Sequence, residues 1–258
     1  MKLATWNVNS LNVRLPHVLE WIAQHQPDVL CLQETKLEDA KFPRAVLRDA
    51  GYHTVFSGQR TYNGVAILSK TPAEDPLKGV PALDDDQQRV ISATICGVRV
   101  VCVYVPNGES LESPKFQYKM KWLAALRTWL TAELERFPLL AVAGDYNIAP
   151  EPRDVHDPDL WAAKIHFTPP ERDALHALFG IGLVDSFRLF DQPERSYTWW
   201  DYRMMAFRRK MGLRIDHILL SPTLAPLCTS CAIDIEPRKL ERPSDHAPVL
   251  AELEIRRA

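Results

Sequence analysis

The chain has 258 residues, of which 46% are hydrophobic and 25% charged, and its formal net charge is −2. This composition is typical of a globular protein and excludes a disordered or fibrous chain, and a charge this close to zero excludes a strong overall field for polyanions. The longest apolar runs, such as residues 98–105, fall far short of the about 20 residues that a membrane-spanning helix needs.

The first half of the chain alternates short apolar runs with helical patterns. Residues 3–6 form an apolar run that predicts a strand. In residues 15–25 apolar side chains recur at spacings of three and four, which predicts a helix with Pro16 in its first turn; a second helix is expected at residues 42–50. Further strands are predicted at residues 29–33, 54–57, 65–69, 89–95 and 98–105, the last two joined at Gly97 as a hairpin.

The second half begins with a long helix. Ser113 is a suitable cap and Pro114 a suitable first residue for a helix that runs to about Arg136. Residues 150–165 read as a proline-rich, charged loop. A helix at 169–179 and strands at 139–143, 213–220, 229–235 and 248–255 complete the predicted elements. Because no linker divides the chain, residues 1–258 are expected to form a single α/β domain of mixed sheets with helices outside.

The five cysteines predict a reducing environment. Cys31, Cys96 and Cys102 lie in or beside apolar runs, which favours buried free thiols. Cys228 and Cys231 have CxxC spacing, but no second pair of ligands follows at the spacing of a zinc site, so a structural role is favoured over a redox role. The N-terminal residues lack the apolar segment of a secretory signal, and a cytoplasmic protein is therefore expected.

Polar side chains follow or interrupt the predicted strands at five places. In isolation, Asn and Asp after a strand are ordinary turn residues, and one histidine is more often structural than catalytic. An Asp within a strand is rarer, because a buried carboxylate needs a partner. Together the five places indicate a site at the strand ends; they are Asn7, Glu34, the pair Asp145 and Asn147, the pair Asp216 and His217, and the run Ser244-Asp245-His246.

These residue types suit phosphoester chemistry. In an extended chain Asp145 and Asn147 point to one face, which places a carboxylate that can deprotonate water beside an amide that can donate to an oxyanion. Glu34 offers the hard oxygen ligands that Mg²⁺ prefers.

Two further groups suit the phosphate itself. Asp216 and His246 fit an Asp–His pair, in which the carboxylate fixes the imidazole tautomer and stabilises its protonated form. Such an imidazolium would neutralise charge on a phosphoryl oxygen. Tyr104 and Asn107, after another predicted strand, add a phenol and an amide that can bind phosphate.

In chain order, these segments resemble the exonuclease III family of DNA-repair nucleases, within the wider endonuclease/exonuclease/phosphatase superfamily. The resemblance covers nearly the whole chain; one short motif would be weak support, but eight in family order are specific. The motifs are TWNVN (5–9), QETK (33–36), YVPN (104–107), GDYNIA (144–149), FTPPER (167–172), YTWW (197–200), RIDH (214–217) and SDH (244–246).

The resemblance implies a four-layer α/β sandwich: two mixed sheets face to face, helices outside, and the active site at one edge. It also implies a Mg²⁺ cofactor, with Mn²⁺ as an alternative. Glu34 would be the principal ligand, with Asn7 and Asp245 nearby.

The same resemblance implies the reaction and the substrate. Asp145 would act on the attacking water, and Asn147, Tyr104 and the Asp216–His246 pair would act on the phosphate during in-line hydrolysis. The expected partner is double-stranded DNA with damaged or blocked 3′ ends, and the expected activities are 3′-5′ exonuclease, 3′-phosphatase and abasic-site endonuclease. A monomer is expected.

Residues 197–210 combine aromatic with basic side chains. Aromatic rings stack on bases or sugars and cations meet phosphates, so Trp199 and Arg203 are candidate DNA contacts. The alternative is a core aromatic cluster beside a solvated basic loop. The resemblance favours contact, since Trp199 matches the family position that packs against an abasic sugar. Met204 and Met205 fit a wedge in a groove, although adjacent methionines more often fill gaps.

Several lysines are candidates for contacts with the DNA backbone. Lys36, in the QETK motif, is a candidate substrate contact. Lys115, Lys119 and Lys121 lie on the long predicted helix, and for these three a solvated helix face is the favoured interpretation.

His166 departs from the family pattern, which has Gly or Ser at this position. A bulky imidazole at the cleft would fill space that DNA needs where it continues past a lesion. We therefore expect His166 to weaken cleavage at internal abasic sites and to spare the removal of 3′-terminal phosphates or nucleotides. The alternative is a surface histidine without effect.

Two other functions compete with a DNA nuclease. Relatives in the superfamily also cleave other phosphate esters, so a phosphatase acting on a non-DNA ester is the main alternative. A non-catalytic nucleic-acid-binding module would lack the catalytic carboxylates, and all of them are present here.

Overall fold

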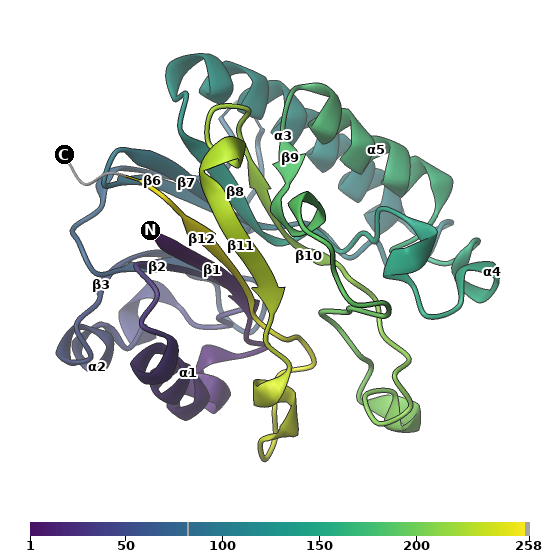
Figure 1. Ribbon diagram of the computed structural model, residues 1–258, viewed down its shortest axis with the longest axis horizontal. Coiled ribbons are helices and arrows are strands. Elements are labelled where there is room, and N and C mark those ends of the chain that lie inside the picture. The colour runs from purple at the N-terminus through teal and green to yellow at the C-terminus, as the bar shows by residue number, and fades with distance from the viewer. Residues whose placement is uncertain (82, 256–258) are drawn as a thin grey trace.

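Two six-stranded mixed sheets lie face to face at the centre of this computed structural model, which describes residues 1–81 and 83–255 (Figure 1). Helices cover both outer faces, which confirms the predicted four-layer α/β sandwich. On the first sheet these are α1 (Leu11–His25) and α2 (Arg44–Asp49), and on the second α3 (Pro114–Arg136) and α5 (Pro169–Gly180). The last three residues of the expected domain lie outside the described residues.

The first sheet combines strands from both ends of the chain, in the order β11 (Cys228–Ile233), β12 (Val249–Leu253), β1 (Lys2–Asn7), β2 (Val29–Gln33), β4 (Val65–Ser69) and β3 (His53–Ser57). The order in the second is β5 (Glu74–Lys78), β6 (Val90–Ile95), β7 (Val98–Tyr104), β8 (Leu140–Asp145), β10 (Asp216–Leu220) and β9 (Val184–Asp185). β1 runs parallel to β2, and β7 to β8. The carboxyl ends of these pairs meet at one edge, where Asn7 contacts Asp145.

The continuous apolar strands are explained by burial on both faces. In β2, Val29 and Cys31 join the core between the sheets, whereas Leu30 and Leu32 join the core under α1 and α2. Successive side chains of a strand point to opposite faces, so a sheet covered on both sides needs apolar residues at every position.

The predicted hairpin at Gly97 is confirmed. β6 and β7 are antiparallel and pair up to Ile95 and Val98. The two residues between them, Cys96 and Gly97, have φ angles of 49° and 76°. Two positive φ angles are the requirement of the tight turn that matches the twist of adjacent strands.

Helix α1 begins four residues before the predicted start at residue 15, so the placement of Pro16 in the first turn is wrong. The start is set by contacts from elsewhere in the chain: the amide of Leu11 donates to the carbonyl of Thr35 at 3.0 Å. The carbonyl of Ser10 accepts from the amides of Val13 and Arg14.

Three other predictions need correction. The segment 150–165 is not all loop: Asp157 caps a short helix, α4 (Pro158–Trp161), by accepting from the amide of Leu160. The strand predicted from residue 213 begins at Asp216. Strands β5 and β9 were not predicted, because β5 is a mostly exposed edge strand and β9 has two residues.

Among the described residues, no helix is long and apolar enough to cross a membrane.

Candidate active site

The strand register places three polar side chains in one row at the edge of the second sheet. Tyr104 at the end of β7 pairs with Asp145 at the end of β8, which pairs with Asp216 at the start of β10. In the first sheet, Asn7 ends β1 beside Gln33, and Glu34 follows directly. The two sets face each other across the core.

Asn7 joins the two sets. Its side chain is buried, and its Nδ2 donates to Glu34 Oε1 at 2.9 Å and to Asp145 Oδ2 at 2.8 Å. Its Oδ1 accepts from the amide of Asn9 at 3.0 Å. The side-chain amide of Asn7 therefore links the carboxylate of Glu34, which follows a strand of the first sheet, to the carboxylate of Asp145 at the end of a strand of the second sheet.

Asn147 lies beside Asp145, but not through an extended chain. β8 ends at Asp145, and Asn147 has a φ of 51°, so the prediction that extended geometry aligns the two is wrong. The chain instead turns back, and the amide of Asn147 donates to Asp145 Oδ1 at 2.8 Å. The Nδ2 of Asn147 donates to the carbonyl of Val105 at 3.0 Å, which fixes the orientation of its amide.

Asp216 and His246 form a buried pair. His246 Nδ1 lies 2.9 Å from Asp216 Oδ2, and its Nε2 lies 3.8 Å from Asp145 Oδ2. Burial by itself lowers the pKa of His246, but the carboxylates of Asp216 and Asp145 outweigh it and raise that pKa to about 10. The ring is therefore an imidazolium at neutral pH, with Nε2–H directed toward Asp145.

Burial raises the pKa of Asp145 to about 7; the positive charge of His246 opposes this rise and Asp216 adds to it. A carboxylate with a pKa near neutrality exchanges protons readily at that pH. Burial, together with the charges of Glu34 and Asp145, raises the pKa of Tyr104 well above its usual value, so its phenol remains a hydrogen-bond donor.

Many residues around the site have left-handed backbone conformations. The φ angles of the five residues are all positive: Asn9 (43°), Glu34 (50°), Lys36 (53°), Asn147 (51°) and His166 (78°). Such conformations cost free energy for residues other than glycine and cluster at functional sites. They also aim these side chains in directions that regular strands would not allow.

The donor set fits a hard divalent cation. Ligand atoms of Glu34, Asp145 and His246 all lie within 4.8 Å of one another. His246 is a poor ligand, because its Nδ1 is bonded to Asp216 and its ring is protonated. The two carboxylates repel each other unless a cation lies between or near them, and carboxylate oxygens are the ligands that Mg²⁺ prefers.

Asp245 lies apart from this group. Its Oδ1 accepts from Asn9 Nδ2 at 2.9 Å and its Oδ2 from Trp199 Nε1 at 3.0 Å. Asn9 in turn accepts from Lys36, whose Nζ is also 2.9 Å from Glu34 Oε2. The structure thus brings Asn7 to Glu34 directly, whereas Lys36 and Asn9 connect Glu34 to Asp245. Asn9 was missed as a site residue, although it stands in the TWNVN motif.

Two cavities, of about 720 and 520 Å³, meet at Asn107. Glu34, Lys36 and Tyr104 line the larger, and the smaller is lined by His166, Trp199 and Arg203. The side chain of Asn107 is exposed, and its Nδ2 lies 3.4 Å from Asn147 Oδ1. The site is therefore a groove open on both sides of Asn107.

The aromatic segment divides between core and site. Tyr197 and Trp200 are buried with Phe207 beside them, as the core alternative predicted. Trp199 is only partly buried, and its ring lies 6.0 Å from that of His166. The guanidinium of Arg203 is exposed and bonded to its neighbour Asp201.

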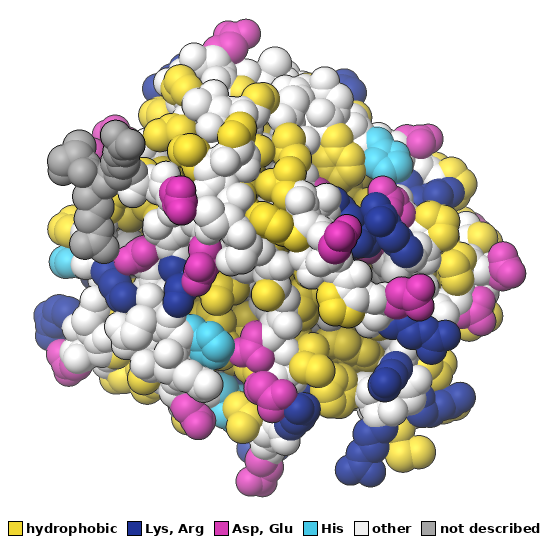
Figure 2. All heavy atoms as spheres, in the orientation of Figure 1, with side chains coloured by type: hydrophobic (Ala, Val, Ile, Leu, Met, Phe, Trp, Pro, Cys, Tyr) yellow, Lys and Arg dark blue, Asp and Glu magenta, His cyan; other side chains and the backbone are white. Residues whose placement is uncertain are grey.

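The loop that follows is basic and exposed. Figure 2 shows Lys and Arg side chains gathered at its lower right, over the loop that carries residues 203–210 in Figure 1. Met204 and Met205, at the tip, are 71% and 64% exposed, so they do not fill a gap in the core.

The prediction that Lys119 lies on a solvated helix face is wrong. Its side chain is wholly buried, whereas Lys115 and Lys121 are exposed. Helical spacing gave a signal, because Lys119 stands three residues after Phe116 and four before Leu123, which are both buried. Its partner, Glu171, lies in the FTPPER motif and was not predicted as a site residue.

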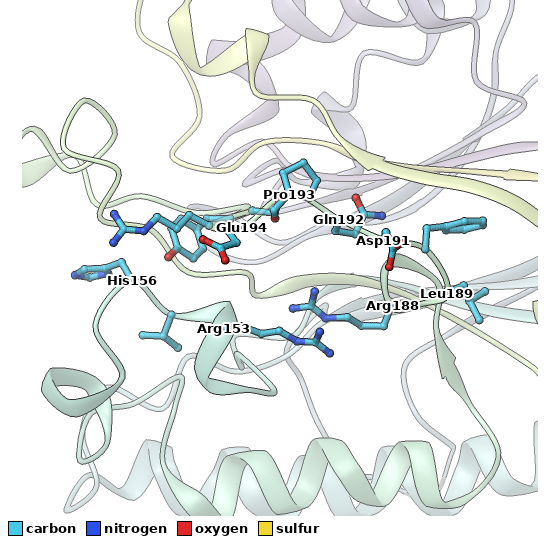
Figure 3. A pocket seen from close by; sticks show the side chains of 13 residues that line it. Arg153, His156, Arg188, Leu189, Asp191, Gln192, Pro193 and Glu194 are labelled. Carbon is cyan, nitrogen blue, oxygen red and sulfur yellow. The ribbon is translucent and has the colours of Figure 1, made fainter.

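The cavity of about 970 Å³ drawn in Figure 3 lies away from this site. Its lining comes from residues 153–156 and 188–197 and includes none of the predicted site residues. Arg153 and Arg188 project from one side of it and Glu194 from the other. Cavity size alone therefore does not identify the candidate active site.

Comparison with known proteins finds relatives along the whole chain. The profile described as "Endonuclease/Exonuclease/phosphatase family" matches residues 4–246. The chain is 39% identical to Exodeoxyribonuclease III of Haemophilus influenzae, over 98% of this chain and 99% of that protein. It is 34% identical to DNA repair nuclease APEX1 of Danio rerio, over 96% of this chain and 81% of that protein.

Solved structures of similar proteins also match nearly the whole chain. The 3′ phosphatase NExo from Neisseria, in a structure bound to product DNA hairpin, superposes with a TM-score of 0.97 at 52% identity, covering 99% of this chain and 100% of that chain. An AP endonuclease from Archaeoglobus fulgidus superposes with a TM-score of 0.95 at 43% identity and the same coverage.

Proposed function

Because this chain belongs to the endonuclease/exonuclease/phosphatase family, we propose that it is a DNA-repair phosphodiesterase that removes 3′-terminal phosphates and nucleotides from double-stranded DNA. The observation that carries the proposal is the cluster in which Asn7 holds Glu34 and Asp145 together beside the protonated His246. The 3′ phosphatase NExo, at 52% identity, supports the choice of substrate.

In this proposal, Asp145 orients and deprotonates the attacking water. Its carboxylate is fixed by Asn7 and by the amide of Asn147, so it cannot rotate away from the water. Its raised pKa matches a base that works near neutral pH.

The substrate phosphate, in this proposal, lies against hydrogen-bond donors and against the positive charge of the His246 ring. The imidazolium of His246, held by Asp216, neutralises charge that develops on a phosphoryl oxygen, and Asn147 and Tyr104 donate hydrogen bonds to the other oxygens. Asn107 binds the phosphate from the open side of the groove. His246 is held in place before the substrate arrives, whereas Asn147, whose Nδ2 bonds to Val105 and Asp145 here, would turn one N–H to the phosphate.

The cofactor in this proposal is Mg²⁺, with Mn²⁺ as an alternative. Glu34 would be the principal ligand, assisted by Asn7 and by Asp245 through the groups around Asn9. When bound, such an ion stabilises negative charge on the phosphate and on the leaving oxygen. Lys36, which bonds to Glu34 here, would turn to the DNA backbone.

The setting of the enzyme is also proposed: one catalytic domain over residues 1–258, a monomer, and a cytoplasmic location. All five cysteines are among the described residues and all are free. Cys31 and Cys102 are buried in the core between the sheets, whereas Cys96, which was predicted to be buried, is exposed. Thiols so placed support a reducing compartment.

A panel of end-labelled duplexes tests the proposed function. The substrates carry a 3′-phosphate, a recessed 3′-hydroxyl or an internal abasic site, and a soluble phosphate ester serves as a fourth arm. We expect cleavage of the first two with Mg²⁺ and weak cleavage of the third. Turnover of the soluble ester without any action on DNA would instead indicate a phosphatase for a non-DNA ester.

His166 supports the preference for 3′ ends. The residue is 6% exposed, and its ring lies between Asn147, whose carbonyl is 2.8 Å from Nδ1, and Trp199. Burial and the nearby Lys119 lower the pKa of His166 to about 4, so the ring is neutral and occupies space without adding charge. Bonding to a carbonyl places the proton on Nδ1, which leaves Nε2 as an acceptor facing Asn107.

Replacing His166 by glycine is expected to raise cleavage at internal abasic sites by roughly tenfold or more, equivalent to about 1.4 kcal/mol, and to leave 3′-phosphate removal nearly unchanged. The fold should persist, because glycine adopts the φ of 78° at this position without strain. The measurement is the ratio of the two rates on the duplex panel.

Arg195→Gly is the matched control. Arg195 is exposed and has a φ of 58°, so glycine relieves backbone strain there too, but the residue lies at the cavity of Figure 3 and outside the groove. Its rate ratio should equal that of the wild type. Equally poor abasic-site cleavage by the His166→Gly variant would show that the ring is not the obstacle.

A further inference from the structure

A buried ion pair lies directly beneath the groove, between helices α3 and α5. Lys119 Nζ is 2.5 Å from Glu171 Oε1, and both side chains are 0% exposed. The attraction within such a pair is largely offset by the cost of removing both charges from water, so a buried pair adds little stability compared with apolar side chains of similar size. Its presence therefore needs another explanation.

Lys119 holds the backbone of two residues that face the substrate in the proposed function. Besides the bond to Glu171, its Nζ donates to the carbonyl of Asn147 at 2.8 Å and to that of Asn107 at 3.2 Å. Three N–H groups thus meet three acceptors. Through these bonds the ammonium fixes the distance between two loops that are 40 residues apart in the chain.

Glu171 extends the same network to His166. Its Oε1 accepts from the amide of His166 at 3.0 Å, and its Oε2 accepts from the amide and hydroxyl of Thr168 at 3.1 and 2.7 Å. The carboxylate therefore fixes the loop just before α5. That loop carries His166 in its left-handed conformation.

The carbonyl of Asn147 connects Lys119 to His166 directly. The carbonyl of Asn147 accepts from Lys119 and also lies 2.8 Å from His166 Nδ1. The loops of Asn107, Asn147 and His166 consequently all bond to one buried pair of charges.

We infer that Lys119 and Glu171 form a positioning pair, which sets the side chains of Asn107 and Asn147 against the substrate phosphate and the ring of His166 against the DNA end. This inference rests on the proposed function. Neither side chain reaches the groove, so both act through the residues that they hold. A displacement of about 1 Å at reacting groups is enough to lower a rate by roughly 10²-fold.

The chain offers a matched control. Arg99 and Glu133 form a second buried pair, with side chains 4% and 2% exposed, and Glu133 lies on the same helix as Lys119. Arg99 bonds to Ser92 and to the carbonyl of Asp75. It lies near the start of β7, whereas Tyr104 of the groove is at the other end of that strand. Loss of this pair should cost stability without disturbing the groove.

The experiment compares Lys119→Met, Glu171→Met, the double variant and Arg99→Met by urea unfolding and by kcat and KM for 3′-phosphate removal. We expect both single variants at the groove to lose stability and roughly 10²-fold in kcat. The double variant should regain stability, because no unpaired charge remains buried, yet kcat should stay low. Arg99→Met should lose stability and keep its kcat.

Two outcomes are decisive against the inference. Recovery of kcat together with stability in the double variant would mean that the pair only supports the fold, and full kcat in Lys119→Met would mean that it holds nothing the reaction needs. Both outcomes leave the proposed function intact. A wild-type protein that is folded but inactive on every duplex would overturn the proposed function and this inference with it.

Discussion

Asp145→Asn is expected to lower kcat for 3′-phosphate removal by about 10³-fold, because the amide cannot accept a proton from the attacking water. Asparagine has the same shape but only one side-chain oxygen. Of the bonds that Asn7 donates to Oδ2 and the amide of Asn147 donates to Oδ1, only one therefore keeps its acceptor. The measurement is single-turnover phosphate release at saturating enzyme. A rate within tenfold of the wild type would contradict the role of Asp145.

The same variant should lose part of the pH dependence of stability that the wild type shows. Burial raises the pKa of Asp145 from 3.8 to about 7, so between these pH values the folded protein binds a proton that the unfolded chain releases. The free energy of unfolding therefore falls as pH rises through this window, and an uncharged asparagine removes this contribution to the pH dependence. Urea unfolding of both proteins across this pH window measures the difference separately from the loss of activity.

Asp216→Asn is expected to lower kcat by about 10²-fold. Asp216 is bonded to His246 Nδ1 at 2.9 Å, and its negative charge helps to keep that ring protonated. An amide in its place loses the charge and can turn its own N–H toward Nδ1, which reverses the tautomer and weakens the hold on the phosphate. The measurement is kcat on the 3′-phosphate duplex.

Asp234→Asn is the control for this change. Asp234 Oδ2 lies 3.2 Å from His25 Nε2, so it forms another Asp–His pair, but on the outside of the first sheet and away from the groove. We expect its kcat to equal that of the wild type. If both variants keep full activity, His246 does not need Asp216 for the reaction.

Mixed sheets with helices outside were predictable because most of the buried strands are apolar at nearly every position, whereas the four-layer sandwich was implied by the family resemblance. A continuous apolar run such as that in Val29–Gln33 is typical of a strand that is covered on both faces. The start of the long helix was predictable from Ser113, which caps it, and from Pro114, its first residue. The missed strand β5 shows the limit. It is exposed and lies at an edge, so its residues carry no apolar signal.

The polar residues at the strand ends were visible in the sequence, but their contacts were not. Asn147 reaches Asp145 through a left-handed turn, which the two-residue spacing does not reveal. Lys119 was misassigned because a buried lysine is unusual without a partner, and Glu171 stands 52 residues away. Such pairings depend on how helices pack, and helix packing is set by the whole fold.

The metal dependence of 3′-phosphate removal is the most direct test of metal-assisted hydrolysis at this site. Phosphate release by the wild type is measured with Mg²⁺, after chelation by EDTA, and after Mg²⁺ is restored, with Glu34→Gln in parallel. Glu34 and Asp145 both accept a hydrogen bond from the side-chain amide of Asn7, so their carboxylates lie close enough together to bind one ion. We therefore expect chelation to abolish phosphate release and restored Mg²⁺ to recover it. The Glu34→Gln variant should need a much higher Mg²⁺ concentration for the same rate. Release that continues in EDTA would contradict metal-assisted hydrolysis at this site.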